Sequence, residues 1–145
     1  MKKLIKKQTN MGYRLMTEPV VLDSSAILAV IFDEPGTHKV IPYLPWACVS
    51  SINRTETLNI IARKSGCSSV EEAKKWYEPL EIETISVDQV QSDVATELNI
   101  HSRKLGLSIG DCICLALGKT KTFPIFTADK AWAELDLGLD IRIIR

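Results

Sequence analysis

The sequence predicts one α/β domain, built on a central parallel β-sheet of about five strands with helices on both faces. The first observation is that five short apolar runs alternate with longer segments of helical periodicity. The second is that 145 residues, of which 46% are hydrophobic, suffice for one compact core and leave little for another. The third is that neither an internal repeat nor a low-complexity segment interrupts this pattern.

Each predicted strand is a short apolar run. The run Val20-Val21-Leu22 is the clearest, because it contains no polar residue and ends at an acid. The predicted strands cover residues 19–22, 46–49, 82–87, 123–126 and 141–144.

Helices are predicted between these strands, where apolar residues recur every three or four positions. They cover residues 24–33, 37–44, 51–65, 69–79, 88–105, 109–120 and 129–135. In the longest helix, we expect the buried stripe to consist of Val90, Val94, Leu98, His101 and Leu105.

Helix ends are marked by capping residues. Ser68 or Ser69 precedes two glutamates, the pattern of an N-cap followed by acids in the first turn. Gly66 and Gly106 stand where helices are expected to end.

The formal charge of zero hides an uneven distribution. Five of the 18 basic residues fall within the first fifteen positions, so the remaining chain carries 13 basic against 18 acidic residues, a formal charge of −5. We therefore expect a basic N-terminal extension over residues 1–17, flexible or extended, and a folded domain over residues 18–145. An acidic body is not a general binder of polyanions, so any nucleic acid must be met through local basic patches, the basic arm or a bound cation.

No segment resembles a signal peptide or a membrane span. We therefore expect a soluble cytoplasmic protein without membrane association. The four cysteines, Cys48, Cys67, Cys112 and Cys114, lack the spacing of a zinc site, and buried free thiols are the expected state.

Four acids form the candidate functional constellation. Asp23 directly follows the apolar run 20–22, and Asp129 closely follows the run 123–126. Open parallel sheets build their sites at the carboxyl ends of strands, where these two strands can be neighbours. Glu56 and Asp111 lie in otherwise apolar helical segments that can point into the same cleft.

Carboxylates gathered in one pocket repel each other unless a cation joins them. Oxygen ligands alone suit Mg²⁺ or Mn²⁺ better than zinc, and such an ion is suited to phosphodiester hydrolysis. Each acid also has a structural explanation: Asp23 and Asp129 can cap helices, Asp111 can be a first-turn charge, and Glu56 can be an exposed helix position.

The ordered motifs resemble those of the PIN domain family, specifically the VapC-type toxin ribonucleases of type II toxin–antitoxin systems. The motifs are DSSA at 23–26, SINRTE at 51–56, LSIGD at 107–111 with CLAL at 114–117, and TADKAW at 127–132. The resemblance runs from about Val20 to Arg145. It implies a PIN-like three-layer fold.

The resemblance also implies a role for each acid. Asp23 and Asp111 would be the principal metal ligands, Glu56 would bind metal or position water, and Asp129 would complete the pocket. Ser24, Asn53 and Thr127 match positions that could hold the carboxylates or a phosphate, with structural capping as the alternative role.

The activity implied is that of an endoribonuclease dependent on Mg²⁺ or Mn²⁺. The implied partners are an RNA substrate, a VapB-like antitoxin and a second copy of the chain in a homodimer. We expect partner binding on the early helices around Phe32, Tyr43 and Trp76.

One position departs from the family pattern. Close relatives often carry arginine directly after the third acid, whereas this chain has Cys112. Any role of that arginine is vacant here, or is filled by Arg54, Arg103, Lys104 or Lys130.

Two other functions compete with RNA cleavage. A phosphoacceptor receiver module also combines strand-end aspartates with Mg²⁺, although Asp23 is followed by serines rather than by a second acid. A catalytically silent member that binds RNA or antitoxin is the other alternative, and the replacement at Cys112 keeps it open.

Overall fold

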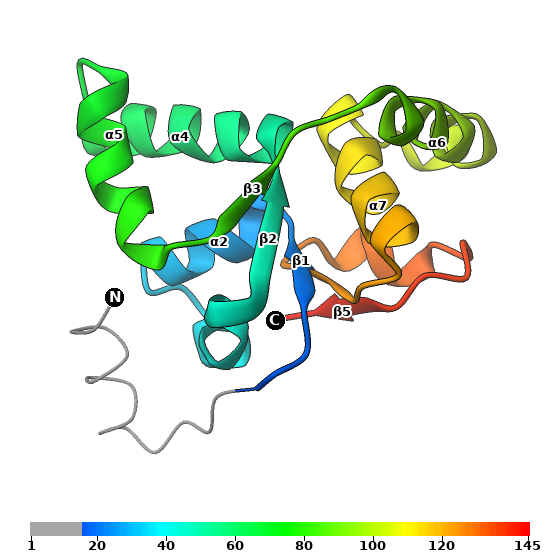
Figure 1. The fold of residues 1–145 in the computed structure, drawn as a ribbon, viewed down its shortest axis with the longest axis horizontal. Helices are drawn as coiled ribbons and strands as arrows, with labels where there is room; N and C mark the ends of the chain where they lie inside the picture. The colour runs from blue at the N-terminus through cyan, green and yellow to red at the C-terminus, as the bar shows by residue number, and fades with distance from the viewer. Residues whose placement is uncertain (1–15) are drawn as a thin grey trace.

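A computed structural model describes residues 16–145, and it contains the predicted five-stranded parallel sheet (Figure 1). The strands are β1 (Val20–Leu22), β2 (Ala47–Ser50), β3 (Glu83–Ile85), β4 (Ile125–Thr127) and β5 (Ile141–Ile143). Their spatial order is β3-β2-β1-β4-β5, and every neighbouring pair is parallel. The prediction of fold class is confirmed. The predicted extension over residues 1–17 lies almost entirely outside the described residues.

Strand β1 is the centre of the sheet. Val20 pairs with Ala47 of β2, and Val21 pairs with Ile125 of β4. The chain adds β2 and β3 on one side of β1 and then β4 and β5 on the other. The order of the strands therefore reverses between β1 and β4, the two strands that precede Asp23 and Asp129.

The helices follow the predicted alternation with the strands. The α-helices are α2 (Ser24–Ile31), α3 (Thr37–Val40), α4 (Ser51–Ser65), α5 (Val70–Tyr77), α6 (Gln89–His101) and α7 (Ile109–Lys121). Short 3₁₀ helices are η1 (Ile41–Trp46), η2 (Glu78–Leu80), η3 (Arg103–Leu105) and η4 (Lys130–Glu134). Ser69 caps α5, and Gly66 ends α4 with a positive φ of 66°, as predicted. None of the helices within 16–145 is both long and apolar enough to span a bilayer.

The sheet separates two hydrophobic cores, because successive strand side chains point to opposite faces. On one face, Val20 and Leu22 pack with residues of α2, α4 and α5. On the other, Val21 packs with α6, α7 and Trp132 of η4. Figure 1 shows α4 and α5 on the left of the sheet and α6 and α7 on the right. The molecule therefore has three layers.

The predicted buried stripe of the longest helix is partly wrong. Val90 is 63% exposed, Leu105 is 44% exposed and His101 is also exposed. The buried side chains of α6 are instead Gln91, Ala95 and Leu98. The stripe assumed one continuous helix through Leu105, but α6 ends at His101 and a separate 3₁₀ turn follows. Only the middle of the apolar pattern therefore faces α7.

Candidate functional site

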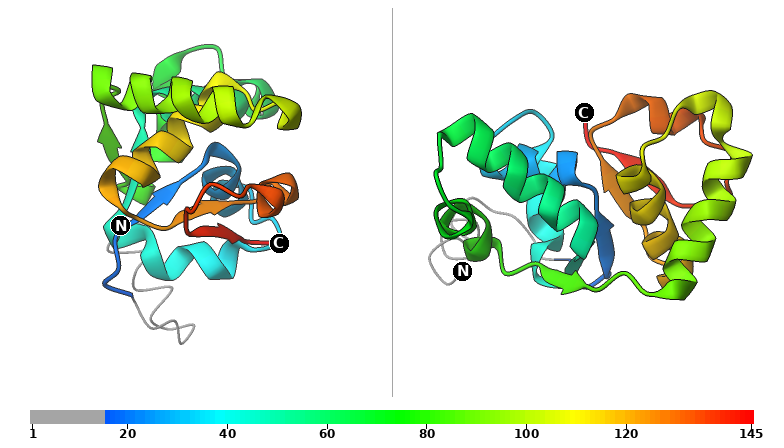
Figure 2. Two further views of the ribbon diagram at one scale, coloured as in Figure 1. Left: turned by 90° about the vertical axis from the view of Figure 1, so that its right-hand side faces the viewer. Right: turned by 90° about the horizontal axis from the view of Figure 1, so that it is seen from above.

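The candidate site lies at the carboxyl edge of the sheet, where the strand order reverses between β1 and β4. Ligands of open α/β sheets bind at this kind of position. The start of α4 contacts the start of α2 through Glu56 and Ser24 and the start of α7 through Asn53 and Gly110. Figure 1 shows the starts of α4 and α7 near each other at the top of the view, and the right-hand view of Figure 2 shows these helices on either side of β1.

Asp23 is the buried acid of the site. It follows β1, is 5% exposed and caps α2. Its Oδ2 atom accepts hydrogen bonds from the hydroxyls of Ser25 at 2.6 Å and Thr127 at 2.9 Å. Burial raises the pKa of Asp23; the two hydroxyls oppose this rise, and the charges of Asp111 and Glu56 add to it. Asp23 therefore lies within the electric field of two other predicted site acids.

Glu56 reaches the site from α4. Ser50 at the end of β2 caps this helix, so α4 starts beside the end of β1. The side chain of Glu56 is exposed, but Ser24 donates a hydrogen bond to its Oε2 atom at 2.6 Å. Glu56 is therefore oriented by α2 and is not a free surface glutamate.

Asn53 joins α4 to α7. Its side chain is fully buried, and its Nδ2 group donates to the carbonyl of Gly110 at 3.1 Å. Its Oδ1 atom accepts a hydrogen bond from the hydroxyl of Ser50. Both halves of the amide are thus used, and they fix the start of α7 relative to α4.

Asp111 stands in the first turn of α7. Its Oδ2 atom accepts from the backbone N–H of Ser108 at 2.8 Å, while the Ser108 hydroxyl accepts from the N–H of Asp111 at 3.1 Å. This reciprocal pair is a capping box. Gly110 beside it lies next to Glu56, because a Cβ atom there would be 3.4 Å from Glu56 Oε2, an ordinary van der Waals contact. Asp111 is therefore the predicted first-turn charge of α7 and in addition part of its cap, and its other oxygen accepts no hydrogen bond from the described residues.

Asp129 is linked to the site through β4. Its backbone N–H donates to the hydroxyl of Thr127 at 3.1 Å, and that hydroxyl in turn donates to Asp23. Its own carboxylate is exposed and accepts from the N–H of Ala131 at 2.9 Å, which caps η4. The predicted cap is present here too.

The four carboxylates share one feature within residues 16–145: one oxygen accepts hydrogen bonds and the other accepts none. The oxygens that accept are Asp23 Oδ2, Glu56 Oε2, Asp111 Oδ2 and Asp129 Oδ1. Each carboxylate is therefore oriented through one of its oxygens, and its second oxygen accepts no hydrogen bond from the described residues.

The donor set fits a hard divalent cation, because it consists of carboxylate and hydroxyl oxygens. No three Asp, Glu, His or Cys side chains in the described part of the chain converge closely enough to hold a metal ion between them. Proteins commonly bind Mg²⁺ through one or two carboxylates, with water and substrate phosphate completing its shell.

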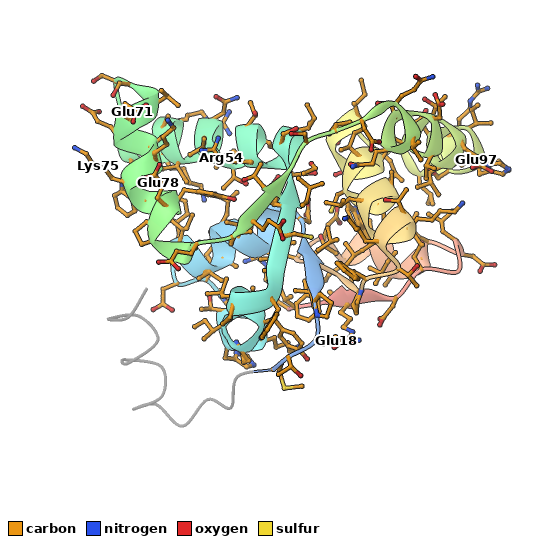
Figure 3. All side chains as sticks on the ribbon, viewed as in Figure 1. Glu18, Arg54, Glu71, Lys75, Glu78 and Glu97 are labelled. Atoms are coloured by element: carbon orange, nitrogen blue, oxygen red, sulfur yellow. The ribbon has the colours of Figure 1, made fainter. Side chains whose placement is uncertain are left out.

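Cys112 lies on the side of α7 that packs against α6. It is buried, and Asn99 of α6 donates to its sulfur at 3.4 Å. The residue directly after Asp111 therefore packs at the contact between α6 and α7 in this chain. Arg54 is also engaged elsewhere, since its guanidinium lies 5.3 Å from the centre of the Tyr77 ring. Figure 3 places Arg54 on α4, toward the α5 side of the molecule.

Sequence reasoning did not include Ser25 in the site. The structure places its hydroxyl against Asp23, Thr127 and the backbone of Ala128. A serine two positions after a strand-end aspartate was a usable signal, because it falls in the first turn of the helix that the aspartate caps.

The fold and the position of the acids place this chain in the class of doubly wound α/β proteins with an acidic site at the topological switch point of the sheet. Within that class, a family model identifies the family of this chain. The model of the PIN domain family matches residues 20–137, and the chain belongs to this family.

Several characterised proteins are similar to this chain. A protein of Mycolicibacterium smegmatis named Ribonuclease VapC is 26% identical over 125 residues, which cover 81% of this chain and 97% of that protein. The DNA-bound VapBC structure of Salmonella typhimurium superposes with a TM-score of 0.70 at 12% identity, covering 89% of this chain and 100% of the matched chain. The structure of Mycobacterium tuberculosis VapC20, described as a toxin that cleaves the sarcin–ricin loop, superposes with a TM-score of 0.64 at 16% identity. The latter match covers 85% of this chain and 98% of the other.

The receiver alternative is wrong. Receivers with the flavodoxin-like fold have the strand order 2-1-3-4-5, whereas this sheet has the order 3-2-1-4-5. The family match points the same way.

Proposed function

We propose that this protein is a metal-dependent endoribonuclease that acts as the toxin of a type II toxin–antitoxin pair. The observation that carries the proposal is the set of four acids around the switch point, each held by one oxygen with the other left open. Membership of the PIN domain family and the similarity to a ribonuclease named VapC support it.

In this proposal Asp23 and Asp111 would be the principal ligands of Mg²⁺ or Mn²⁺. Glu56 would bind the ion or orient the attacking water, and Asp129 would complete the pocket. The bound cation would supply activation of water and neutralisation of charge on the attacked phosphate. Water rather than the ribose 2′-hydroxyl attacks phosphorus, and the bond from phosphorus to the 3′-oxygen breaks. The products are 5′-phosphate and 3′-hydroxyl ends.

Three side chains support the carboxylates. Ser24 orients Glu56, Thr127 orients Asp23, and Asn53 fixes the distance between the start of α4 and the start of α7. The roles predicted for these residues are thereby supported by contacts with the acids or with the helices that carry them.

The partners follow from the same proposal: RNA as substrate in the cytoplasm, a VapB-like antitoxin, and a second copy of the chain. Two of the three aromatic residues expected to bind a partner lie together, since the ring centres of Phe32 and Trp76 are 6.1 Å apart and Trp76 is 47% exposed. Tyr43 instead packs edge-on against Phe126, 4.8 Å away. We therefore assign the antitoxin contact to the surface formed by Phe32 and Trp76.

RNA cleavage by the purified protein tests the proposal. We expect cleavage only with Mg²⁺ or Mn²⁺, with 5′-phosphate and 3′-hydroxyl ends. Asp111→Asn should abolish it, while Asp93→Asn, an exposed acid on α6, should leave it unchanged. A cyclic phosphate product, or full activity in the presence of EDTA, would contradict the proposed mechanism.

A further inference from the structure

Ser25 lies at the first turn of α2 and connects the ends of β1 and β4. Its hydroxyl donates to Asp23 Oδ2 at 2.6 Å and accepts from the backbone N–H of Ala128 at 2.9 Å. It also lies 3.2 Å from the hydroxyl of Thr127. A single side chain therefore contacts the buried acid and the backbone that leads to Asp129.

The protons of the two hydroxyls can be assigned. Each hydroxyl has only one proton. The short contacts of Ser25 and Thr127 with Asp23 use both protons, so their 3.2 Å approach to each other carries no further donation. Their lone pairs then accept the N–H groups of Ala128 and Asp129.

The two hydroxyls donate to the same oxygen of Asp23, Oδ2. The backbone N–H of Ser25 also points to Oδ2, at 3.4 Å. Within the part of the chain that the structure describes, no donor reaches Oδ1. The carboxylate is thus fixed in rotation, with Oδ2 turned toward the protein and Oδ1 left without a protein donor.

We propose that Ser25 is a positioning residue that makes Asp23 a ligand through Oδ1 alone. The inference rests on the proposed binding of a divalent cation. Without the Ser25 hydroxyl, Asp23 loses its shortest hydrogen bond, and the N–H of Ala128 loses its acceptor. Both the orientation of Asp23 and the course of the chain toward Asp129 then relax.

Binding of Mn²⁺ to the full chain without RNA, measured by titration calorimetry, tests this role directly. Ser25→Ala should weaken Mn²⁺ binding by about 10- to 100-fold, the usual effect of removing a residue that orients a metal ligand. Ser25→Thr retains the hydroxyl and should bind Mn²⁺ nearly as tightly as the wild type. Ser92→Ala, an exposed serine on α6, should bind like the wild type.

RNA cleavage gives a second readout. If Ser25 acts through the metal ligand, the Mn²⁺ concentration needed for half-maximal cleavage rises in Ser25→Ala, and saturating Mn²⁺ restores most of the rate. A purely structural role would not be relieved in this way. If Ser25→Ala does not fold, Ser25→Cys, which keeps the volume with a weaker donor, serves for the same comparison.

Failure of the proposed metal dependence and failure of the role proposed for Ser25 would give different results. Absence of Mn²⁺ binding by the wild-type protein would overturn the proposed metal dependence and this inference with it. Normal binding by the wild type together with unchanged affinity in Ser25→Ala, or in Ser25→Cys where that variant is used, would overturn only the role of Ser25.

Discussion

The hydroxyl of Ser24 donates to Oε2 of Glu56 at 2.6 Å and so ties the start of α2 to α4 across 32 residues of sequence. Ser24 itself is 4% exposed, whereas Glu56 is an exposed residue. The buried hydroxyl is therefore the fixed partner, and it limits where the long and otherwise mobile side chain of Glu56 can point.

Replacement of Ser24 by alanine should release Glu56. We expect the rate of RNA cleavage to fall by about 10- to 100-fold, as for other residues that orient a functional carboxylate. Stability should fall by only about 1 kcal/mol, because the exposed carboxylate can bind water instead. Single-turnover cleavage and urea denaturation measure the two effects.

Ser68 provides a matched control for Ser24. It forms a second serine–glutamate contact, with Glu72 Oε2 at 3.2 Å, on the exposed start of α5. Ser68→Ala should leave cleavage unchanged. Equal losses of activity in Ser24→Ala and Ser68→Ala would contradict a specific role for Ser24.

Asp23→Asn should stabilise the metal-free protein at neutral pH while abolishing cleavage. Burial raises the pKa of Asp23 above its ordinary value of 3.8, so the folded state favours the protonated carboxyl. The stability from that proton is complete below pH 3.8 and is lost as the pH rises through the folded-state pKa. Asparagine resembles the protonated form, and its carbonyl can still accept from Ser25 and Thr127.

Thermal unfolding in EDTA checks the sign of this effect. Asp23→Asn should melt at a higher temperature than the wild type at pH 7, by roughly 3 °C for each kcal/mol in a chain of this size. The difference should shrink toward acidic pH, while Asp93→Asn should show no comparable change. A wild type that is the more stable of the two at pH 7 without metal would refute the argument.

The proximity of Asp23 to the end of β4 could be predicted from the sequence, because β1 and β4 are both short apolar runs that end in polar residues. Parallel pairing then brings their carboxyl ends together, as β1 and β4 show. The position of Asn53 against Gly110 could not be predicted in the same way. It depends on how the helices pack, and local sequence does not encode the distance between α4 and α7.

The errors in the secondary structure also have local causes. In α6 the apolar residues continue beyond the point where the helix ends at His101, so the pattern overestimated the buried face. The predicted helical segment 129–135 is present but shorter, as a 3₁₀ helix over residues 130–134 between the capping Asp129 and the extended Leu135. Periodicity alone does not distinguish these cases.

Asn53→Ala should destabilise the protein and also reduce cleavage. The substitution leaves the Gly110 carbonyl without its donor and the proton of the Ser50 hydroxyl without its acceptor, at a cost of about 1–3 kcal/mol. It also frees the start of α7, which carries Asp111. Denaturant unfolding and cleavage at a temperature where the variant remains folded separate the two effects. Asn59→Ala, exposed on the same helix, should change neither, and an equal effect of both substitutions would contradict the role of Asn53.

Gly118→Ala should lower stability through the contact between α7 and β4. A Cβ atom at Gly118 would lie 2.3 Å from both Cγ1 and Cδ1 of Ile125, so the Ile125 side chain, the helix or the strand has to shift. Overpacking of this kind typically costs about 1–3 kcal/mol, more than alanine gains by its helix propensity. Ile125→Ala removes both clashing atoms but leaves a cavity, so the double variant should be more stable than the sum of the two single losses predicts. Urea denaturation of the four proteins in this cycle measures the coupling, and simple additivity would show that α7 does not pack on Ile125 at this glycine.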